Sequence, residues 1–296
     1  MSRINRLCFF SAFFPPHTGG VERYVHDLSL KLLEKGCEVE IVTSAYDDNP
    51  GITEYRDMKI YRLPVFMALD KRFPIPRPNA EYRKIINELK LSAPDIFILN
   101  MRIYPLSVLG AGLARKMGKP SILIEHVSGH FKTGRAIGNI AGHAYEHLAT
   151  KYLKKRVNKF YGVSQAVCKW LDHFGIEAVC VIYNGINADD TEPAPTDEIT
   201  LPPPETKVIT FAGRLIKEKG ILLLTEAFER LAARHDNVVL FVAGDGPLED
   251  SLKEQYGSDE RIHILGQVSQ DAVRQLLRRS TMVVIPSFYP EGLPTL

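Results

Sequence analysis

Short apolar runs and longer amphipathic segments alternate along almost the whole chain, and this alternation constrains the fold more than any other feature of the sequence. Residues 4–10 carry the apolar run expected of a buried parallel strand. Residues 21–32 then place apolar side chains at helical spacing, and Gly36 follows as a helix stop. Repetition of this order predicts an α/β fold, with a parallel sheet covered by helices on both faces.

The alternation runs in two series, separated by a polar, proline-rich stretch. In the first series, after the strand and helix just described, strands are expected at 39–43, 95–99, 121–125, 160–163 and 179–182, and helices at 80–91, 105–117, 138–157 and 164–174. In the second series, strands are expected at 208–212, 238–243, 262–265 and 282–285, and helices at 221–233, 248–255 and 271–279.

These series predict two Rossmann-like domains. The first spans residues 1–187, a linker covers 188–206, and the second domain spans 207–296. A doubly wound nucleotide-binding domain normally has about six strands, whereas the second series supplies four. We therefore expect the second domain to be incomplete.

Charge and cysteine content narrow the class of protein further. Residues 1–187 hold 26 Lys and Arg against 17 Asp and Glu, whereas residues 188–296 hold 11 against 18. A basic first half could meet an anionic membrane surface or an anionic acceptor, and no recognised nucleic-acid-binding motif accompanies it.

The four cysteines are scattered without a C-x-x-C pair, which indicates reduced thiols. With no signal peptide or membrane-spanning run, a cytoplasmic protein is expected.

Two candidate positions follow strands of the first domain. Gly19 and Gly20 connect the first strand to the first helix, where backbone N–H groups can approach a phosphate or a sugar. His126 follows the strand at 121–125 and could orient a substrate hydroxyl. A plain tight turn and a structural histidine are the alternatives. A zinc site at His126 and His130 is not expected, because Gly129 argues against the helix it would need.

The second domain offers cations at a matching position. Arg214 and Lys219 lie between its first strand and first helix, where they could clamp a diphosphate. Lys217 and Glu218, in the same loop, have the character of a solvated turn. Glu291 is a lone carboxylate next to Gly292, after the last expected strand.

Taken together, these motifs resemble family-4 glycosyltransferases, which are retaining enzymes of the GT-B fold with two Rossmann-like domains facing a cleft. The resemblance rests on six segments in family order: GGVERY at 19–24, GVS at 162–164, VIYNGI at 181–186, FAGR with EKG at 211–214 and 218–220, AGDGP at 243–247, and PS with EGLP at 286–287 and 291–294.

The resemblance implies roles for individual residues. Those matching the family's donor-diphosphate contacts are Arg214, Lys219, Gly19 and Gly20, and those matching its catalytic or sugar-contacting groups are His126 and Glu291. The backbone at Gly292, Leu293 and Pro294 would contact the donor sugar and phosphate, and Gln267 and Val268 would contact the nucleotide base.

The implied partners are a nucleoside-diphosphate sugar and a saccharide or lipid-linked acceptor, such as a cell-envelope saccharide, with peripheral contact to the inner face of a membrane. No metal or other cofactor is expected, because side chains and backbone N–H groups can stabilise the leaving diphosphate.

One departure from the family pattern concerns the end of the chain. The second acid of the family's Glu-x7-Glu motif should lie eight residues beyond Glu291, and Leu296 is the last residue. We therefore expect a fragment or a truncated product. Two alternatives to an active glycosyltransferase remain. One is a catalytically inactive fragment of such an enzyme, and the other is a different GT-B enzyme, either a nucleotide-sugar epimerase or a sugar phosphorylase.

Overall fold

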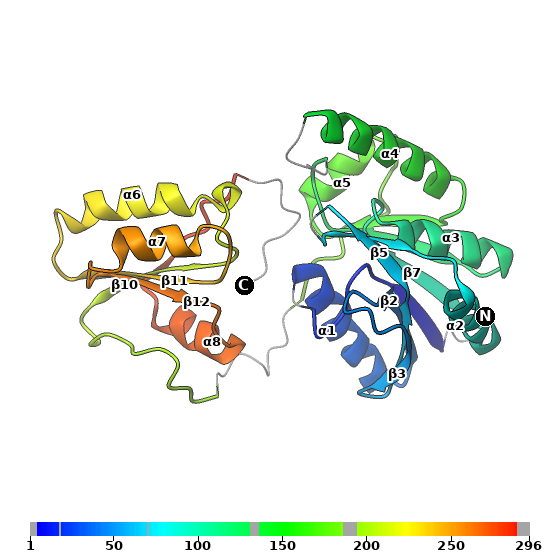
Figure 1. Ribbon diagram of the computed structural model, residues 1–296, viewed down its shortest axis with the longest axis horizontal. Coiled ribbons are helices and arrows are strands. Elements are labelled where there is room, and N and C mark those ends of the chain that lie inside the picture. Colours follow the sequence, from blue (N-terminus) through cyan, green and yellow to red (C-terminus); the bar gives the residue numbers. More distant parts are fainter. Residues whose placement is uncertain (1–4, 18, 70, 131–135, 186–193, 289–296) are drawn as a thin grey trace. The chain divides into compact units, whose positions relative to one another are not determined.

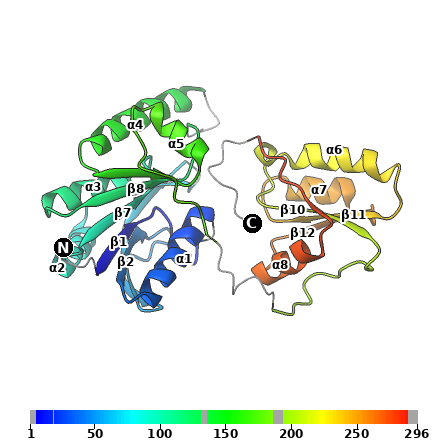
Figure 2. The same cartoon turned by 180° about the vertical axis from the view of Figure 1, so that it is seen from behind.

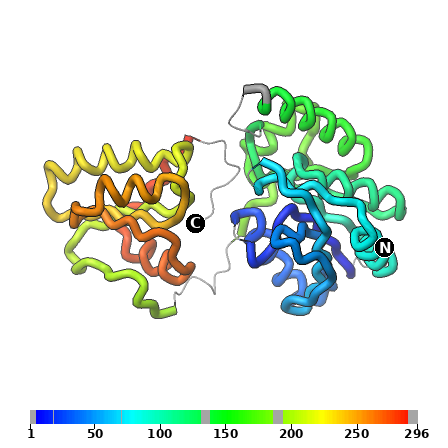
Figure 3. Tube along the Cα trace, in the orientation of Figure 1, coloured from blue at the N-terminus to red at the C-terminus, as the bar shows by residue number. Residues whose placement is uncertain are grey.

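A computed structural model describes residues 5–17, 19–69, 71–130, 136–185 and 194–288, and these residues form two compact units. One unit lies within residues 5–185 and the other within 194–288 (Figure 1). Figure 3 traces the chain through each of them. Among the described helices, none is long and apolar enough to cross a lipid bilayer.

The first unit is built on a seven-stranded sheet with the order β3-β4-β2-β1-β7-β8-β9, in which every neighbouring pair except β3 with β4 is parallel. Its strands are β1 (Arg6–Phe10), β2 (Glu38–Ser44), β3 (Gly51–Tyr55), β4 (Met58–Leu63), β7 (Ile96–Asn100), β8 (Ser121–Glu125) and β9 (Lys159–Gly162), and β5 (Val65–Ala68) pairs with β6 (Phe73–Pro76) in a separate two-stranded sheet. Its helices are α1 (Gly20–Glu34), α2 (Ala80–Ser92), α3 (Pro105–Lys116), α4 (Ala136–Lys154) and α5 (Gln165–Asp172).

Alternate residues of β1 enter two different cores, which explains why this strand is apolar on both sides. Phe9 packs on the face that carries Val25 of α1, and Phe10 packs on the face that carries Leu89 of α2 and Ala111 of α3. Seen from behind, α1 lies on one side of the sheet and α3 and α4 lie on the other (Figure 2). The first unit is therefore the three-layered α/β arrangement that the sequence predicts.

Two parts of the first unit differ from the prediction. Strands β3, β4, β5 and β6 were not expected, and β3 joins β4 through a two-residue turn at Arg56 and Asp57, which both have positive φ. The strand expected at 179–182 is reduced to a single parallel bridge between Gly162 and Val181. That segment still runs along β9, because Val179 and Ile182 donate backbone hydrogen bonds to Phe160 and Gly162.

The second unit has a parallel sheet of order β12-β11-β10-β13 among its described residues. Helices α6 and α7 cover one face through Phe228 and Leu252, and α8 covers the other through Leu276 (Figure 1). The elements are β10 (Lys207–Ala212), the 3-10 turn η2 (Lys217–Lys219), α6 (Ile221–Ala232), β11 (Val238–Ala243), α7 (Glu249–Tyr256), β12 (Ile262–Gly266), α8 (Gln270–Arg279) and β13 (Met282–Val283).

The described part of the expected linker packs on the second unit. Ile199 is buried in the core beside α8, and the carboxylate of Glu198 accepts a hydrogen bond of 2.9 Å from the backbone N–H of Ser269. Residues 194–206 therefore behave as part of the second unit.

Candidate functional site

The first candidate region lies at the carboxyl edge of the first unit's sheet, where β1, β7 and β8 end side by side. Asn100 ends β7 and His126 follows β8, and both side chains are buried. The Nε2 atom of His126 lies 3.1 Å from Oδ1 of Asn100, and Nδ2 of Asn100 donates to the carbonyl of Phe10 at 3.3 Å. Because the carboxyl edge is where open α/β sheets bind ligands, this pair stands at the expected place.

Burial and hydrogen bonding together define the chemical state of His126. Removal from water lowers the pKa of His126 to about 3, so the imidazole is neutral at physiological pH. Asn100 presents its carbonyl oxygen because its amide nitrogen donates to Phe10, and Nε2 of His126 therefore carries the proton. Nδ1 is left as the acceptor of this ring, which suits a hydroxyl group that donates a hydrogen bond.

A buried ion network supports the loop that carries His126. The carboxylate of Glu125 accepts backbone hydrogen bonds from His126 at 3.0 Å and Arg102 at 3.3 Å, and it lies 3.2 Å from Nε of Arg102. Desolvation raises the pKa of Glu125, and the charge of Arg102 opposes that shift. Arg102 also pairs with the buried carboxylate of Glu146 on α4. Met101 adopts a left-handed backbone with φ of 63°, which is uncommon for a residue other than glycine.

The N-terminus of α1 lies beside His126. Tyr24, in the second turn of α1, packs edge-on against the His126 ring with centroids 4.9 Å apart. Its buried hydroxyl has no hydrogen-bond partner among the described residues, and burial raises the pKa of Tyr24 to about 12. Gly19 and Gly20 are exposed at the start of the helix. A Cβ on Gly19 would lie 2.2 Å from Oε2 of Glu22, so this carboxylate fills the space above the first turn.

The second candidate region lies at the carboxyl edge of the second unit's sheet, where the turns after the strands pack backbone against backbone. Gly244 follows β11 with φ of 133°, and a Cβ there would lie 2.0 Å from the carbonyl oxygen of Gly213. Gly220 precedes α6 with φ of 75°, and a Cβ there would lie 2.3 Å from the carbonyl oxygen of Pro286. Only glycine fits such conformations and approaches, so these glycines bring the turns together.

Both predicted cations of the second unit lie at this edge. Arg214 is exposed in the turn after β10, and its side chain forms no hydrogen bond or ion pair with any described residue. Lys219 ends η2, directly before Gly220 and the N-terminus of α6. An arginine fork, an ammonium group and a helix N-terminus are three groups that favour a phosphate anion.

The structure describes only some of the remaining predicted site residues. Gln267 is exposed in the turn after β12, and Val268 is half-buried against the core beside α8. Glu291, Gly292, Leu293 and Pro294 lie outside the described residues. The structure therefore brings His126 close to the start of α1 in the first unit, and it brings Arg214, Lys219 and Gln267 to one sheet edge in the second.

Three residues of the first region were not predicted from the sequence: Asn100, Tyr24 and Arg102. Asn100 could have been found as a polar residue directly after a buried strand, by the same rule that identified His126. Tyr24 is the last residue of the GGVERY segment, but helical spacing alone does not indicate that it contacts the ring of His126. Arg102 carried no local signal, because Glu146 is 44 positions away in the chain.

Comparisons with known proteins agree with the division of the chain into two units. Residues 18–190 match the family described as Glycosyltransferase Family 4, and residues 195–296 match that described as Glycosyl transferases group 1. The structure superposes on sucrose-phosphate synthase from Thermosynechococcus elongatus with a TM-score of 0.74 at 18% identity, covering 98% of this chain and 77% of that one. It superposes on Anabaena HepE in complex with UDP and glucose with a TM-score of 0.65 at 16% identity, covering 97% and 75%. The fold is therefore GT-B.

One curated relative is the phosphatidylinositol N-acetylglucosaminyltransferase GPI3 subunit of Saccharomyces cerevisiae strain YJM789. It is 28% identical over 275 residues, which cover 90% of this chain and 59% of that protein. The chain spans about 60% of the length of the first such relatives it matches.

Proposed function

The chain belongs to glycosyltransferase family 4, and from this premise we propose that it transfers a glycosyl group from a nucleoside-diphosphate sugar to a hydroxyl group of a lipid-linked acceptor. The observation that carries the proposal is the convergence of Arg214, Lys219 and the N-terminus of α6 at one sheet edge. Backbone contacts at Gly220 and Gly244 fix the turns that carry these groups.

In this proposal, the second unit binds the donor. Arg214 donates to the diphosphate oxygens through its guanidinium fork, and Lys219 adds a second positive charge. As the bond to the sugar breaks, the diphosphate gains negative charge, and these groups stabilise it without a required metal ion. The turn at Gln267 and Val268 would contact the base.

The first unit contributes a neutral histidine. Nδ1 of His126 would accept a hydrogen bond from a sugar hydroxyl. The hydroxyl of Tyr24, which has no partner in the described part of the chain, would donate another. A neutral ring can orient a hydroxyl without adding positive charge beside the sugar. Retention at the anomeric carbon is part of the proposal and rests on the family resemblance.

The names of similar proteins support particular substrates to test first. HepE is described in complex with UDP and glucose, and the yeast relative is named as the GPI3 subunit of a phosphatidylinositol N-acetylglucosaminyltransferase. We therefore include UDP-linked sugars, with UDP-N-acetylglucosamine first, and both inositol phospholipids and lipid-linked saccharides as acceptors.

The test is transfer of radiolabelled sugar by the purified chain from a panel of UDP-, ADP- and GDP-sugars to acceptor lipids in vesicles. Label should move to the lipid in wild type, fall by roughly 10²–10³ in Arg214→Ala, and persist in Lys217→Ala, a neighbouring exposed lysine. Activity in EDTA would support the metal-independent step. Isomerised donor sugar without an acceptor would instead indicate an epimerase, and absence of any transfer across the panel would count against the proposal.

We also propose that the first unit meets anionic lipid peripherally, on the cytoplasmic side of a membrane. Four exposed lysines cluster around the end of α4: Lys151, Lys154, Lys155 and Lys159. Leu153 and Val157, between them, are buried in the core of the unit. Contact with lipid would therefore be electrostatic and would involve no insertion of these apolar side chains.

A further inference from the structure

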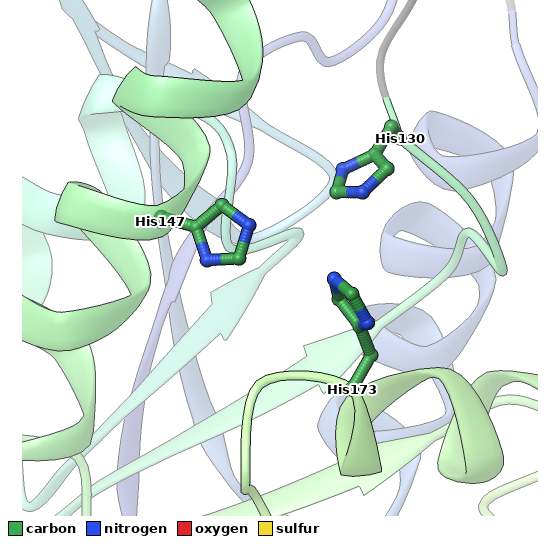
Figure 4. A group of neighbouring side chains, drawn as sticks. All are labelled: His130, His147 and His173. Atoms are coloured by element: carbon green, nitrogen blue, oxygen red, sulfur yellow. The ribbon is translucent and has the colours of Figure 1, made fainter.

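Three histidines from separate segments of the first unit turn their rings toward one another (Figure 4). His130 comes from the loop after β8, His147 from α4, and His173 caps the C-terminus of α5. One ring nitrogen from each lies within 4.8 Å of the other two. The ring centroids are 5.3 Å apart for His130 and His173, 5.6 Å for His147 and His173, and 6.0 Å for His130 and His147.

We propose that these three imidazoles bind one divalent transition-metal ion, with Zn²⁺ as the best fit. Imidazole nitrogen is a favoured ligand of zinc, copper and nickel, and three protein ligands with one open position form a complete zinc site. None of the three histidines belongs to the candidate regions described above, and a metal site here adds a function that sugar transfer does not require.

The three ring nitrogens need to move only slightly closer together to bind one ion. Nitrogens bound to one zinc in tetrahedral geometry at about 2.0–2.1 Å lie about 3.3 Å apart. The three ring nitrogens lie within 4.8 Å of one another, so no pair has to approach by more than roughly 1.5 Å. His147 and His173 are exposed, and rotation of their side chains can supply this movement. His130 is half-buried and provides the fixed ligand.

A carboxylate already orients His130 for metal binding. Its Nδ1 atom lies 2.7 Å from Oε2 of Glu146, which leaves Nε2 for the ion. Carboxylate–histidine pairs of this kind hold the ring orientation of zinc ligands and raise their basicity. Glu146 is itself buried and paired with Arg102, so the support is part of the core of the unit. This buried carboxylate distinguishes the cluster from a chance meeting of surface histidines.

The surroundings contain opposing charges. His147 and His173 line a pocket of about 620 Å³ together with Lys151, Lys154 and Lys155. The ammonium group of Lys154 donates to the carbonyl of Phe174 at 2.9 Å. These cations weaken attraction for a dication, and they favour an anion such as hydroxide or chloride at the open position. The negative charge of Glu146 acts from the other side of His130.

The chain carries its own reporter for this site. Trp170 is the single tryptophan of the sequence, and its ring stacks on His173 at 4.9 Å with an interplanar angle of 4°. It also meets the ring of His130 edge-on at 4.8 Å. A paramagnetic ion held by these histidines should therefore quench the fluorescence of Trp170.

The experiment is titration of the untagged chain with Cu²⁺, followed by tryptophan fluorescence, and with Zn²⁺, followed by calorimetry. We expect saturable quenching with one ion per chain, a lower apparent affinity for Cu²⁺ when Zn²⁺ is present in large excess, and reversal by EDTA. His147→Ala and His173→Ala should each weaken binding of both ions by at least about tenfold, since losing even a supporting partner typically costs 10- to 100-fold.

Two control variants make the outcome decisive. His235→Ala removes an exposed histidine of the second unit, and His143→Ala removes a ring that stacks on His130 but lies outside the triad. Both should bind as wild type, and circular dichroism should show that all four variants are folded. Zn²⁺ should also raise the Tm of wild type but not of His173→Ala. Unsaturable binding, or wild-type affinity in His147→Ala and His173→Ala, would overturn the proposal.

Discussion

Nε2 of His126 and Oδ1 of Asn100 lie 3.1 Å apart at the ends of adjacent parallel strands, and this contact determines which nitrogen of the histidine faces a ligand. The contact depends on the parallel register of β7 and β8, which places Asn100 opposite Ile124. A neutral imidazole in a fixed tautomer is therefore built into the sheet edge.

This arrangement predicts acid sensitivity. The pKa of His126 falls from 6.5 to about 3 on folding because of burial. The unfolded chain therefore binds a proton more readily between these values, and stability falls as pH drops below about 6.5. At pH 5, the loss relative to pH 7 should be about 2 kcal/mol from this group.

The measurement is urea unfolding of wild type and His126→Asn at pH 7 and pH 5. Comparison with the variant removes the contributions of other groups, including Glu22 and Glu125, whose raised pKa values act in the opposite direction. An equal loss of stability in both proteins would show that His126 is not neutralised by burial.

Arg102 should be essential for folding of the first unit. It is fully buried between Glu125 and Glu146, and its guanidinium lies 3.8 Å from the centre of the Phe174 ring. Arg102→Met would leave two buried carboxylates without their cation, at a cost of about 3–5 kcal/mol in unfolding free energy. Arg83→Met, at an exposed position of α2, should change stability by less than about 0.5 kcal/mol in the same denaturation assay.

Gly244 should tolerate no side chain. Gly244→Ala combines positive φ with a collision against the Gly213 carbonyl, and we expect a loss of roughly 3 kcal/mol or more in the second unit. Gly118 has φ of 65°, but a Cβ there would have no atom within 4 Å. Gly118→Ala therefore measures the cost of the left-handed backbone alone, and it should lower the free energy of unfolding by about 1 kcal/mol. Thermal unfolding of both variants tests this difference, and similar losses would mean that the turns do not pack as described.

The lysines at the end of α4 should govern binding to anionic vesicles. Replacing Lys151, Lys155 and Lys159 by Gln should weaken binding by about 3 kcal/mol in total at low salt. Replacing Lys84, Lys90 and Lys116, which are exposed elsewhere on the first unit, is the matched control. Sedimentation with vesicles at low and high salt measures the effect. Binding that does not depend on the charge of the lipid would contradict an electrostatic contact.

Much of the fold was predictable because local patterns and long-range structure agree. Ser164 caps α5 by accepting a hydrogen bond from the backbone N–H of Val167, where the sequence predicts this helix to begin. Ser269 accepts a hydrogen bond from Ala272 in the same way and caps α8, close to the helix start expected at residue 271. Segment 51–76 was missed because its strands are short and interrupted by Pro64 and Pro74, so they lack the long apolar run of β1.

Some residues of the candidate sites could likewise be predicted from the local sequence, and others could not. Arg214 and His126 could be found because each follows a strand, and the carboxyl edge of a parallel sheet is a general binding position. The histidine triad was not predicted. The expectation of no metal rested on how the leaving diphosphate can be stabilised and on the local sequence around His130, and neither indicates which distant residues pack beside this histidine. His147 and His173 join it only through the packing of α4 and α5.

Calorimetric binding of UDP to the purified chain tests most directly whether Arg214 recognises the donor. Arg214→Ala should lower the affinity for UDP about 10- to 100-fold, the equivalent of charge-assisted hydrogen bonds worth about 1.5–3 kcal/mol. Lys217→Ala, in the same exposed turn, should bind UDP as wild type does. Wild-type affinity in Arg214→Ala would contradict the claim that this sheet edge holds the donor diphosphate.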